Sequence, residues 1–186
     1  MSLSPQDAAA ALADIEQART RSAELRTYQT AAPHFYLWAL IWLVGYGLGD
    51  LAPQLERFAW PALVVPGWLA SVALARRANR SVDAARMRAF WGKFWRLGAV
   101  VLGFCLAVFT VLRPHGLQQA AFWPLLVAAL YCAVGIYAGR RLLVIGIALA
   151  VLTLVGFFAL TGWFLLWMAV VGSGALLAGG LWLRSV

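Results

Sequence analysis

Long apolar runs alternate with short polar segments along most of the chain. Six such runs lie at about 33–52, 58–75, 97–112, 120–138, 142–160 and 162–183. A helix that crosses a bilayer needs about 20 apolar residues, with a range of about 17–25. The third run is short, but it reaches a spanning length if Phe94, Trp95 and the long side chain of Arg96 occupy the interface. The pattern therefore predicts an all-α membrane protein with six transmembrane helices.

Residues 1–32 have a different pattern, with charges of both signs around a modest apolar stripe. Ser4 suits the N-cap of a helix and Pro5 suits its first turn. The stripe has helical spacing and consists of Leu12, Ile15, Ala18, Ser22 and Leu25. It is too weak to insert into a membrane, but it is adequate for packing on a partner. We expect a cytoplasmic amphipathic helix at 1–32, followed by a six-helix transmembrane domain at 33–186.

Composition supports this class, since 63% of the residues are hydrophobic, 12% are charged and the mean hydropathy is +0.81. Soluble proteins are nearer half apolar and a quarter charged. The net charge of +8 would suggest nucleic acid in a soluble chain. Here the cations lie in loops beside apolar helices, where membrane topology and anionic lipid explain them better. We expect no nucleic-acid partner.

The segment 76–96 is the most basic part of the chain and fixes the predicted orientation. Its cations are Arg76, Arg77, Arg80, Arg86, Arg88, Lys93 and Arg96. Lys and Arg in short loops stay on the cytoplasmic side. With both termini also inside, all fifteen Lys and Arg residues except Arg57 and Arg113 become cytoplasmic. The six helices then form three antiparallel hairpins, with the fourth and fifth spans joined tightly through 139–141. Because arginine is far commoner than lysine, we place the protein in a bacterial inner membrane.

The second half of this basic segment carries an apolar stripe that ends in aromatic residues, including Trp91 and Trp95. A basic amphipathic segment with terminal aromatics suits the cytoplasmic interface, where each cation near anionic lipid contributes about 1 kcal/mol. We expect the basic segment to dock anionic lipid headgroups. Binding an acidic protein partner is the alternative.

A polar cluster is expected at the outer face of the membrane. Its members are Asp50, Glu56, Arg57, Arg113 and His115. It could admit a proton or a cation, since ionisable groups near a membrane span often mark ion paths. A solvated group of surface ion pairs, worth about 0–1 kcal/mol each, is the favoured interpretation.

Other reactive side chains do not form a site that we can identify from sequence. His34 and His115 lie at opposite faces, about 30 Å apart, so they cannot share a haem or a metal. Cys105 and Cys132 could together bind Cu(I), although buried thiols usually act as small hydrophobes. Ser173 has no intramembrane base beside it. We therefore expect no cofactor, no metal site and no catalytic residues.

Small residues occur at spacings that allow helix backbones to approach closely. They are Gly45 and Gly49 in the first span, Gly135 and Gly139 in the fourth, and Gly172 and Gly174 in the sixth. Packing within the bundle is the favoured role, and homo-oligomerisation or a channel lined by small residues is the alternative. Similarly, the deeper Trp38, Trp42 and Trp68 pack in the core or against lipid, or else line a pocket for a flat hydrophobic ligand.

These features favour a non-enzymatic polytopic membrane protein that acts as a scaffold, accessory subunit or regulator. Its cytoplasmic helix and basic segment would dock a cytoplasmic or membrane protein partner or anionic lipid. A small transporter or channel for an ion or solute is the alternative. It lacks a buried charge near the middle of the membrane, which such proteins commonly use.

Overall fold

The computed structural model of the protein describes residues 5–78 and 84–185. Almost all of these residues are helical, and none of them forms a strand. Within these ranges, six helices are long and apolar enough to cross a membrane, which confirms the predicted class and number of spans by length and composition. They are Ala11–Leu51, Pro53–Ala78, Trp91–Val111, Leu117–Ala138, Arg140–Ala159 and Thr161–Arg184.

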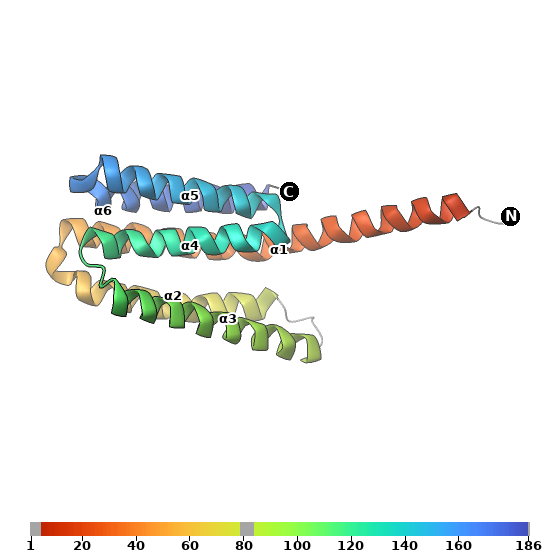
Figure 1. Cartoon of the computed structure of the whole chain (residues 1–186), viewed down its shortest axis with the longest axis horizontal. Coiled ribbons are helices and arrows are strands. Elements are labelled where there is room, and N and C mark those ends of the chain that lie inside the picture. The colour runs from red at the N-terminus through yellow and green to blue at the C-terminus, as the bar shows by residue number, and fades with distance from the viewer. Residues whose placement is uncertain (1–4, 79–83, 186) are drawn as a thin grey trace.

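The first helix, α1, is a single helix from Pro5 to Leu51. It combines the predicted N-terminal helix with the first apolar run, and Pro33 does not interrupt it. A proline inside a helix removes the hydrogen bond to the carbonyl four residues earlier, here that of Gln29. Both residues are exposed, so this carbonyl does not have to be buried without a partner. The first part of α1 projects from the bundle as a long rod (Figure 1).

The other helices cover the predicted runs, but the helix of the third span begins at Ala84 rather than near 97, so the second half of the basic segment continues this span as one helix. After the short η1 (Pro53–Leu55) come α2 (Glu56–Ala78), α3 (Ala84–Val111), α4 (Leu117–Ala138) and α5 (Arg140–Ala159). The last span is divided into η2 (Thr161–Trp163), α6 (Phe164–Trp167), η3 (Met168–Gly172) and α7 (Ser173–Arg184). Here η3 is a π-helical turn, a local widening that is frequent at functional sites.

The core of the bundle lies between α1, α4, α5 and the last span. The most extensive helix contacts join α4 with α5 and α1 with α7, and α2 packs on α1. The largest fully buried side chains include Phe35, Leu149, Phe164, Met168 and Leu176. Spans far apart in sequence therefore build much of the core, in addition to the consecutive pairs suggested by the hairpin pattern.

A tight turn joins α4 to α5, as the short 139–141 linker predicted. Gly139 is the only residue between the two helices, and its φ of 137° is one that side chains rarely adopt. A Cβ atom at Gly135 would lie 2.3 Å from the backbone nitrogen of Leu143. One at Gly146 would lie 2.8 Å from the carbonyl oxygen of Ala128. These glycines let the two backbones approach more closely than side chains would allow.

In contrast, α2 and α3 lie at the side of this core (Figure 1). Only 11% of the apolar window of the second span and 6% of that of the third are buried. Aromatic pairs join α3 to its neighbours, with ring centroids 5.3 Å apart for Phe109 and Phe122 and 5.7 Å apart for Trp68 and Trp95. The gap between these two peripheral helices forms the groove described below.

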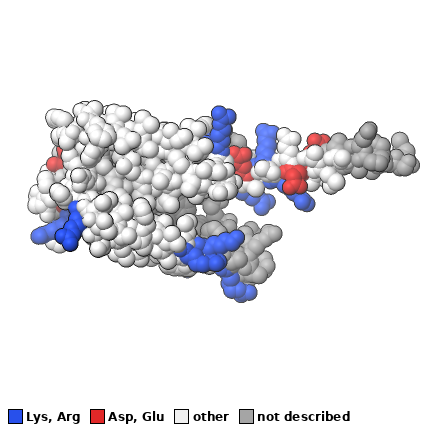
Figure 2. All heavy atoms as spheres, in the orientation of Figure 1, with Lys and Arg blue, Asp and Glu red and all other residues white. Residues whose placement is uncertain are grey.

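Charged side chains gather at the two ends of the bundle and along the projecting part of α1 (Figure 2). The face between the two ends that Figure 2 shows is free of charge. The exposed part of α1, the carboxyl ends of α2 and α7, the start of α3 and the α4–α5 turn share one end (Figure 1). An uncharged band bounded by charged ends is the surface that a bilayer-spanning protein presents to lipid.

Candidate functional site

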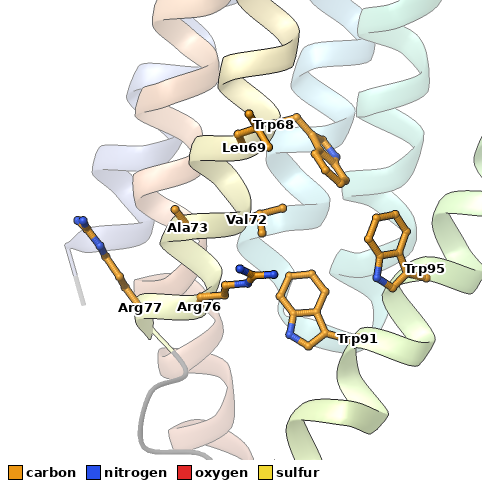
Figure 3. A pocket seen from close by; sticks show the side chains of 8 residues that line it. All are labelled: Trp68, Leu69, Val72, Ala73, Arg76, Arg77, Trp91 and Trp95. Atoms are coloured by element: carbon orange, nitrogen blue, oxygen red, sulfur yellow. The ribbon is translucent and has the colours of Figure 1, made fainter.

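A groove of about 560 Å³ lies between α2 and α3 near their basic ends (Figure 3). It is lined by Trp68, Leu69, Val72, Ala73, Arg76, Arg77, Trp91 and Trp95. Trp68, Val72 and Arg76 follow one another at intervals of four residues along α2, and Trp91 and Trp95 do so on α3. Because residues four apart share a face of a helix, each helix turns one side toward the groove.

The end of the groove farther from Arg76 and Arg77 has an aromatic and apolar wall. The Trp68 and Trp95 rings, one from each helix, have centroids 5.7 Å apart and planes inclined at 57°. They nonetheless remain 39% and 58% exposed, so they do not close the groove. Leu69 and Val72 continue the apolar surface along α2 (Figure 3). This wall can accept a hydrocarbon chain.

The other end of the groove is cationic. The Arg76 guanidinium carbon lies 5.6 Å from the centroid of the Trp91 ring, within the range of a cation–π contact. Figure 3 shows Arg76 extending toward Trp91, whereas Arg77 leaves α2 in another direction. None of the eight lining residues is acidic. The groove thus offers a positive end and an apolar end to one elongated ligand.

Of the predicted docking residues, Arg76, Arg77, Trp91 and Trp95 meet in this groove. Three more lie exposed on α3, namely Arg88, Lys93 and Arg96. Arg96 donates from Nε to the carbonyl of Gly92 in its own helix at 3.1 Å. Arg80 and the side chain of Arg86 lie outside the described part of the chain.

Sequence reasoning did not place Leu69, Val72 and Ala73 in this site, and it named Trp68 only as a residue that could line a pocket together with Trp38 and Trp42. Their contribution depends on how far α2 and α3 separate, which no local pattern encodes. The sequence signal that could have identified this site is the separation of Trp68 and Arg76 by two steps of four residues. This spacing places an aromatic ring and a cation on the same face of one helix.

A second cluster, which the sequence did not predict, fastens α1 to the bundle. The Tyr28 hydroxyl donates to the Glu24 carboxylate and accepts from the backbone N–H of Arg141 at 3.3 Å. The Arg141 guanidinium donates to the Trp182 carbonyl. It also lies 5.7 Å and 5.2 Å from the ring centroids of Tyr28 and Trp182. Three elements, α1, α5 and α7, therefore meet where the rod leaves the bundle.

The predicted outer polar residues lie at the opposite end of the helices. Asp50 and Glu56 are half-buried, whereas Arg57, Arg113 and His115 are exposed. No ion pair joins these five described residues. Instead, Arg57 lies 4.6 Å from the Phe58 ring centroid, and Nδ1 of His115 lies 3.3 Å from the Arg113 carbonyl oxygen. They are neighbours at one face rather than a connected ionic network.

Neither cysteine forms a disulfide, and the Cys132 thiol and the Ser173 hydroxyl donate to nearby carbonyls. The Cys132 thiol points to α5, where it donates to the Leu143 carbonyl at 3.9 Å, and Cys105 is buried on α3; both are free. Ser173 donates to the Ala169 carbonyl and to the Val170 carbonyl, the latter at 3.3 Å. In residues 5–78 and 84–185, no group of three or more His, Cys, Asp or Glu side chains could hold a metal ion.

Most of the predicted packing glycines lie at close approaches. A Cβ would meet the Trp60 ring at Gly45, the Leu143 backbone at Gly135, the Tyr28 hydroxyl at Gly139 and the Met168 side chain at Gly172. At Gly49 it would make an ordinary contact with Leu165 at 3.4 Å. Gly174 faces open space.

The chain matches no protein-family model, no curated protein and no solved structure. A helical architecture by itself does not indicate an activity, since one fold carries many functions. Function must therefore be inferred from the groove, the projecting part of α1 and the distribution of charge.

Proposed function

We propose that the protein is a non-enzymatic membrane scaffold or regulator. In this proposal the projecting part of α1 docks a protein partner, and the basic segment holds anionic lipid. The observation that carries the proposal is the rod itself, because every residue from 11 to 23 is exposed. At 1.5 Å per residue, the part of α1 before Tyr28 is about 35 Å long.

The surface of the rod suits a protein partner better than lipid. Leu12 and Ile15 are 68% and 50% exposed, while acids and arginines alternate around them. A single exposed helix of this length is marginally stable in water, and most helices gain stability by packing an apolar stripe. Acidic side chains such as Asp14 and Glu16 disfavour contact with an anionic membrane. A second helix that covers the stripe therefore fits best.

The cluster at the base of the rod connects a partner bound to the rod with the membrane domain. Tyr28, Arg141 and Trp182 connect the base of the rod to α5 and α7. A partner that changes the position of the rod would act directly on these contacts and, through them, on α5 and α7. This arrangement supports a regulator or accessory subunit, in which a cytoplasmic event changes the bundle.

We also propose that the rod, the basic segment and the carboxyl end face the cytoplasm of a bacterial cell. The supporting argument is the charge bias, since among the cations whose side chains the structure describes only Arg57 and Arg113 belong to the other end. Such a bias sets the orientation of most polytopic proteins.

The test uses a photo-crosslinking amino acid at position 15 of the full-length protein in its native membrane. We expect one protein adduct of constant mass, and the purified partner should then form a binary complex with the full-length chain. The double variant Leu12→Asp/Ile15→Asp should lose this complex, because two charges would lie in the interface. Arg184→Gln, an exposed change at the same end, should retain it. Adducts with lipid alone would contradict the scaffold role.

A small transporter is the second candidate, and η3 is the observation that favours it. Transporters commonly interrupt a spanning helix near the middle of the membrane, and η3 widens the last span at Met168–Gly172. The hydroxyls of Thr153 and Ser173 are directed to carbonyls of their own helices, however, so they offer little to a solute. Solute flux into vesicles that depends on Asp50 would support this candidate over the scaffold.

A further inference from the structure

We propose that the groove between α2 and α3 binds one anionic phospholipid, with the lipid phosphate at Arg76 and the acyl chains along Trp68 and Trp95. This deepens the lipid-holding part of the proposed function and rests on it. The basic segment would thus contain a discrete lipid site, in addition to any general attraction to a charged membrane surface.

The charge of the groove selects an anion. Arg76 and Arg77 are the charged residues in its lining, the Arg76 side chain is the one directed toward Trp91, and no carboxylate of the described residues lines it (Figure 3). Arginine presents several N–H donors that fit phosphate oxygens, and its guanidinium is more weakly hydrated than an ammonium group. The Trp91 ring beside Arg76 stabilises the cation and restricts its side-chain conformations. Less side-chain entropy is therefore lost when an anion binds.

The shape of the groove selects a lipid rather than a free anion. Trp68 lies eight residues before Arg76, which corresponds to a rise of about 12 Å along α2. The apolar wall therefore extends from the charged end toward the middle of the membrane. Inorganic phosphate or a soluble acidic peptide would leave this wall uncovered. A phospholipid has an anionic head and apolar chains in the same order as the groove.

The loose packing of α2 and α3 also leaves room for an occupant. These two spans are the least buried of the six described ones, and at the groove they meet through Trp68 and Trp95. A volume of about 560 Å³ lies within the roughly 300–1,000 Å³ of typical small-molecule sites. It can take a headgroup and the first part of the chains, while the remainder continues into the bilayer.

Native mass spectrometry of the full-length protein in mild detergent tests this site, with phosphatidylglycerol and phosphatidylcholine as probes. We expect one phosphatidylglycerol to bind at least tenfold more tightly than phosphatidylcholine. The double variant Arg76→Gln/Arg77→Gln should lose tenfold or more of this affinity, since each cation near an anionic lipid contributes about fivefold. Arg184→Gln removes a cation at the same end, outside the groove, and should change the affinity less than twofold.

A second measurement tests the apolar wall. Phosphatidylglycerol with brominated chains should quench tryptophan fluorescence in the wild type, and Trp68→Phe/Trp95→Phe should reduce the quenched fraction. Unchanged affinity in the double arginine variant would overturn the proposal. So would an equal loss in Arg184→Gln, which indicates general surface attraction, or displacement of the lipid by equimolar inorganic phosphate. Because α1 is unaltered in these variants, protein docking is tested separately, and either result can fail alone.

Discussion

At Gly135 the absence of a side chain sets the distance between α4 and α5. A Cβ there would lie 2.3 Å from the Leu143 nitrogen and 2.7 Å from its Cα. Backbone atoms cannot move aside as the end of a flexible side chain can. We therefore expect Gly135→Ala to lower the free energy of unfolding by about 1–3 kcal/mol, as overpacking does elsewhere. Thermal unfolding in one detergent measures the difference.

Gly174 provides the matched control for this substitution. It also lies in a spanning helix, but a methyl group added there would have no described atom within 4 Å, apart from its own helix and its chain neighbours. Gly174→Ala should be neutral or raise the stability by up to about 1 kcal/mol, because alanine favours the helix. Equal losses in both variants would contradict the close approach of α4 and α5.

Sequence alone indicated some of these residue roles and missed others. The four-residue spacing of glycines identified Gly45, Gly49, Gly135 and Gly139, and a Cβ would be crowded at all of these except Gly49, where it would make an ordinary contact. It missed Gly146, which faces Ala128 and Cys132, and the small-residue pattern included Gly174, which faces open space. A spacing rule reports that a helix has a small face. It does not report which helix packs there.

Individual helices differ strongly in how much of their stability comes from packing. Leu149 on α5 is 1% exposed, whereas Leu102 on α3 is 61% exposed. Leu149→Ala should cost about 2–5 kcal/mol, because a buried cavity remains. Leu102→Ala should cost under about 1 kcal/mol, since lipid or detergent fills the space. Thermal unfolding of both variants in the same detergent checks this, and a cost at Leu102 as large as at Leu149 would show that α3 packs within the bundle.

The contacts of Arg141 join the base of the α1 rod to α5 and α7, and we expect them to restrict the angle of the rod. Removing its guanidinium in Arg141→Gln would break the bond to the Trp182 carbonyl and both cation–ring contacts. We expect a broader distribution of distances between spin labels at residues 15 and 181, measured by electron–electron resonance after the native cysteines are replaced. Arg140→Gln, an exposed neighbour, should leave the distribution unchanged. A similar broadening in both variants would show that the cluster does not hold the rod.

For the whole molecule, the sequence was sufficient for the spans but not for their arrangement. Hydropathy locates a spanning helix because every apolar run must reach a fixed length, whatever its neighbours are. Which helix faces pack together is set by the shapes of their side chains. Hydropathy does not identify these faces, because the helices are apolar on most sides. The α2–α3 groove and the Tyr28–Arg141–Trp182 cluster depend on that arrangement, so their residues could be recognised only as cations and aromatics. The boundary predicted between residues 32 and 33 is not a helix end, because α1 continues through it.

The orientation of the whole molecule leads to the last prediction. If the basic end of the bundle is cytoplasmic, a fluorescent protein fused after Val186 should fluoresce, and alkaline phosphatase inserted at Arg80 should be inactive. The same phosphatase inserted at His115, at the opposite end, should be active because it would lie in the oxidising periplasm. Moving segment 76–96 across the membrane would carry seven cations with it, against the bias that retains Lys and Arg inside. Phosphatase activity at Arg80 would therefore show that the orientation is the reverse of the proposed one, with both the rod and the lipid groove at the outer face.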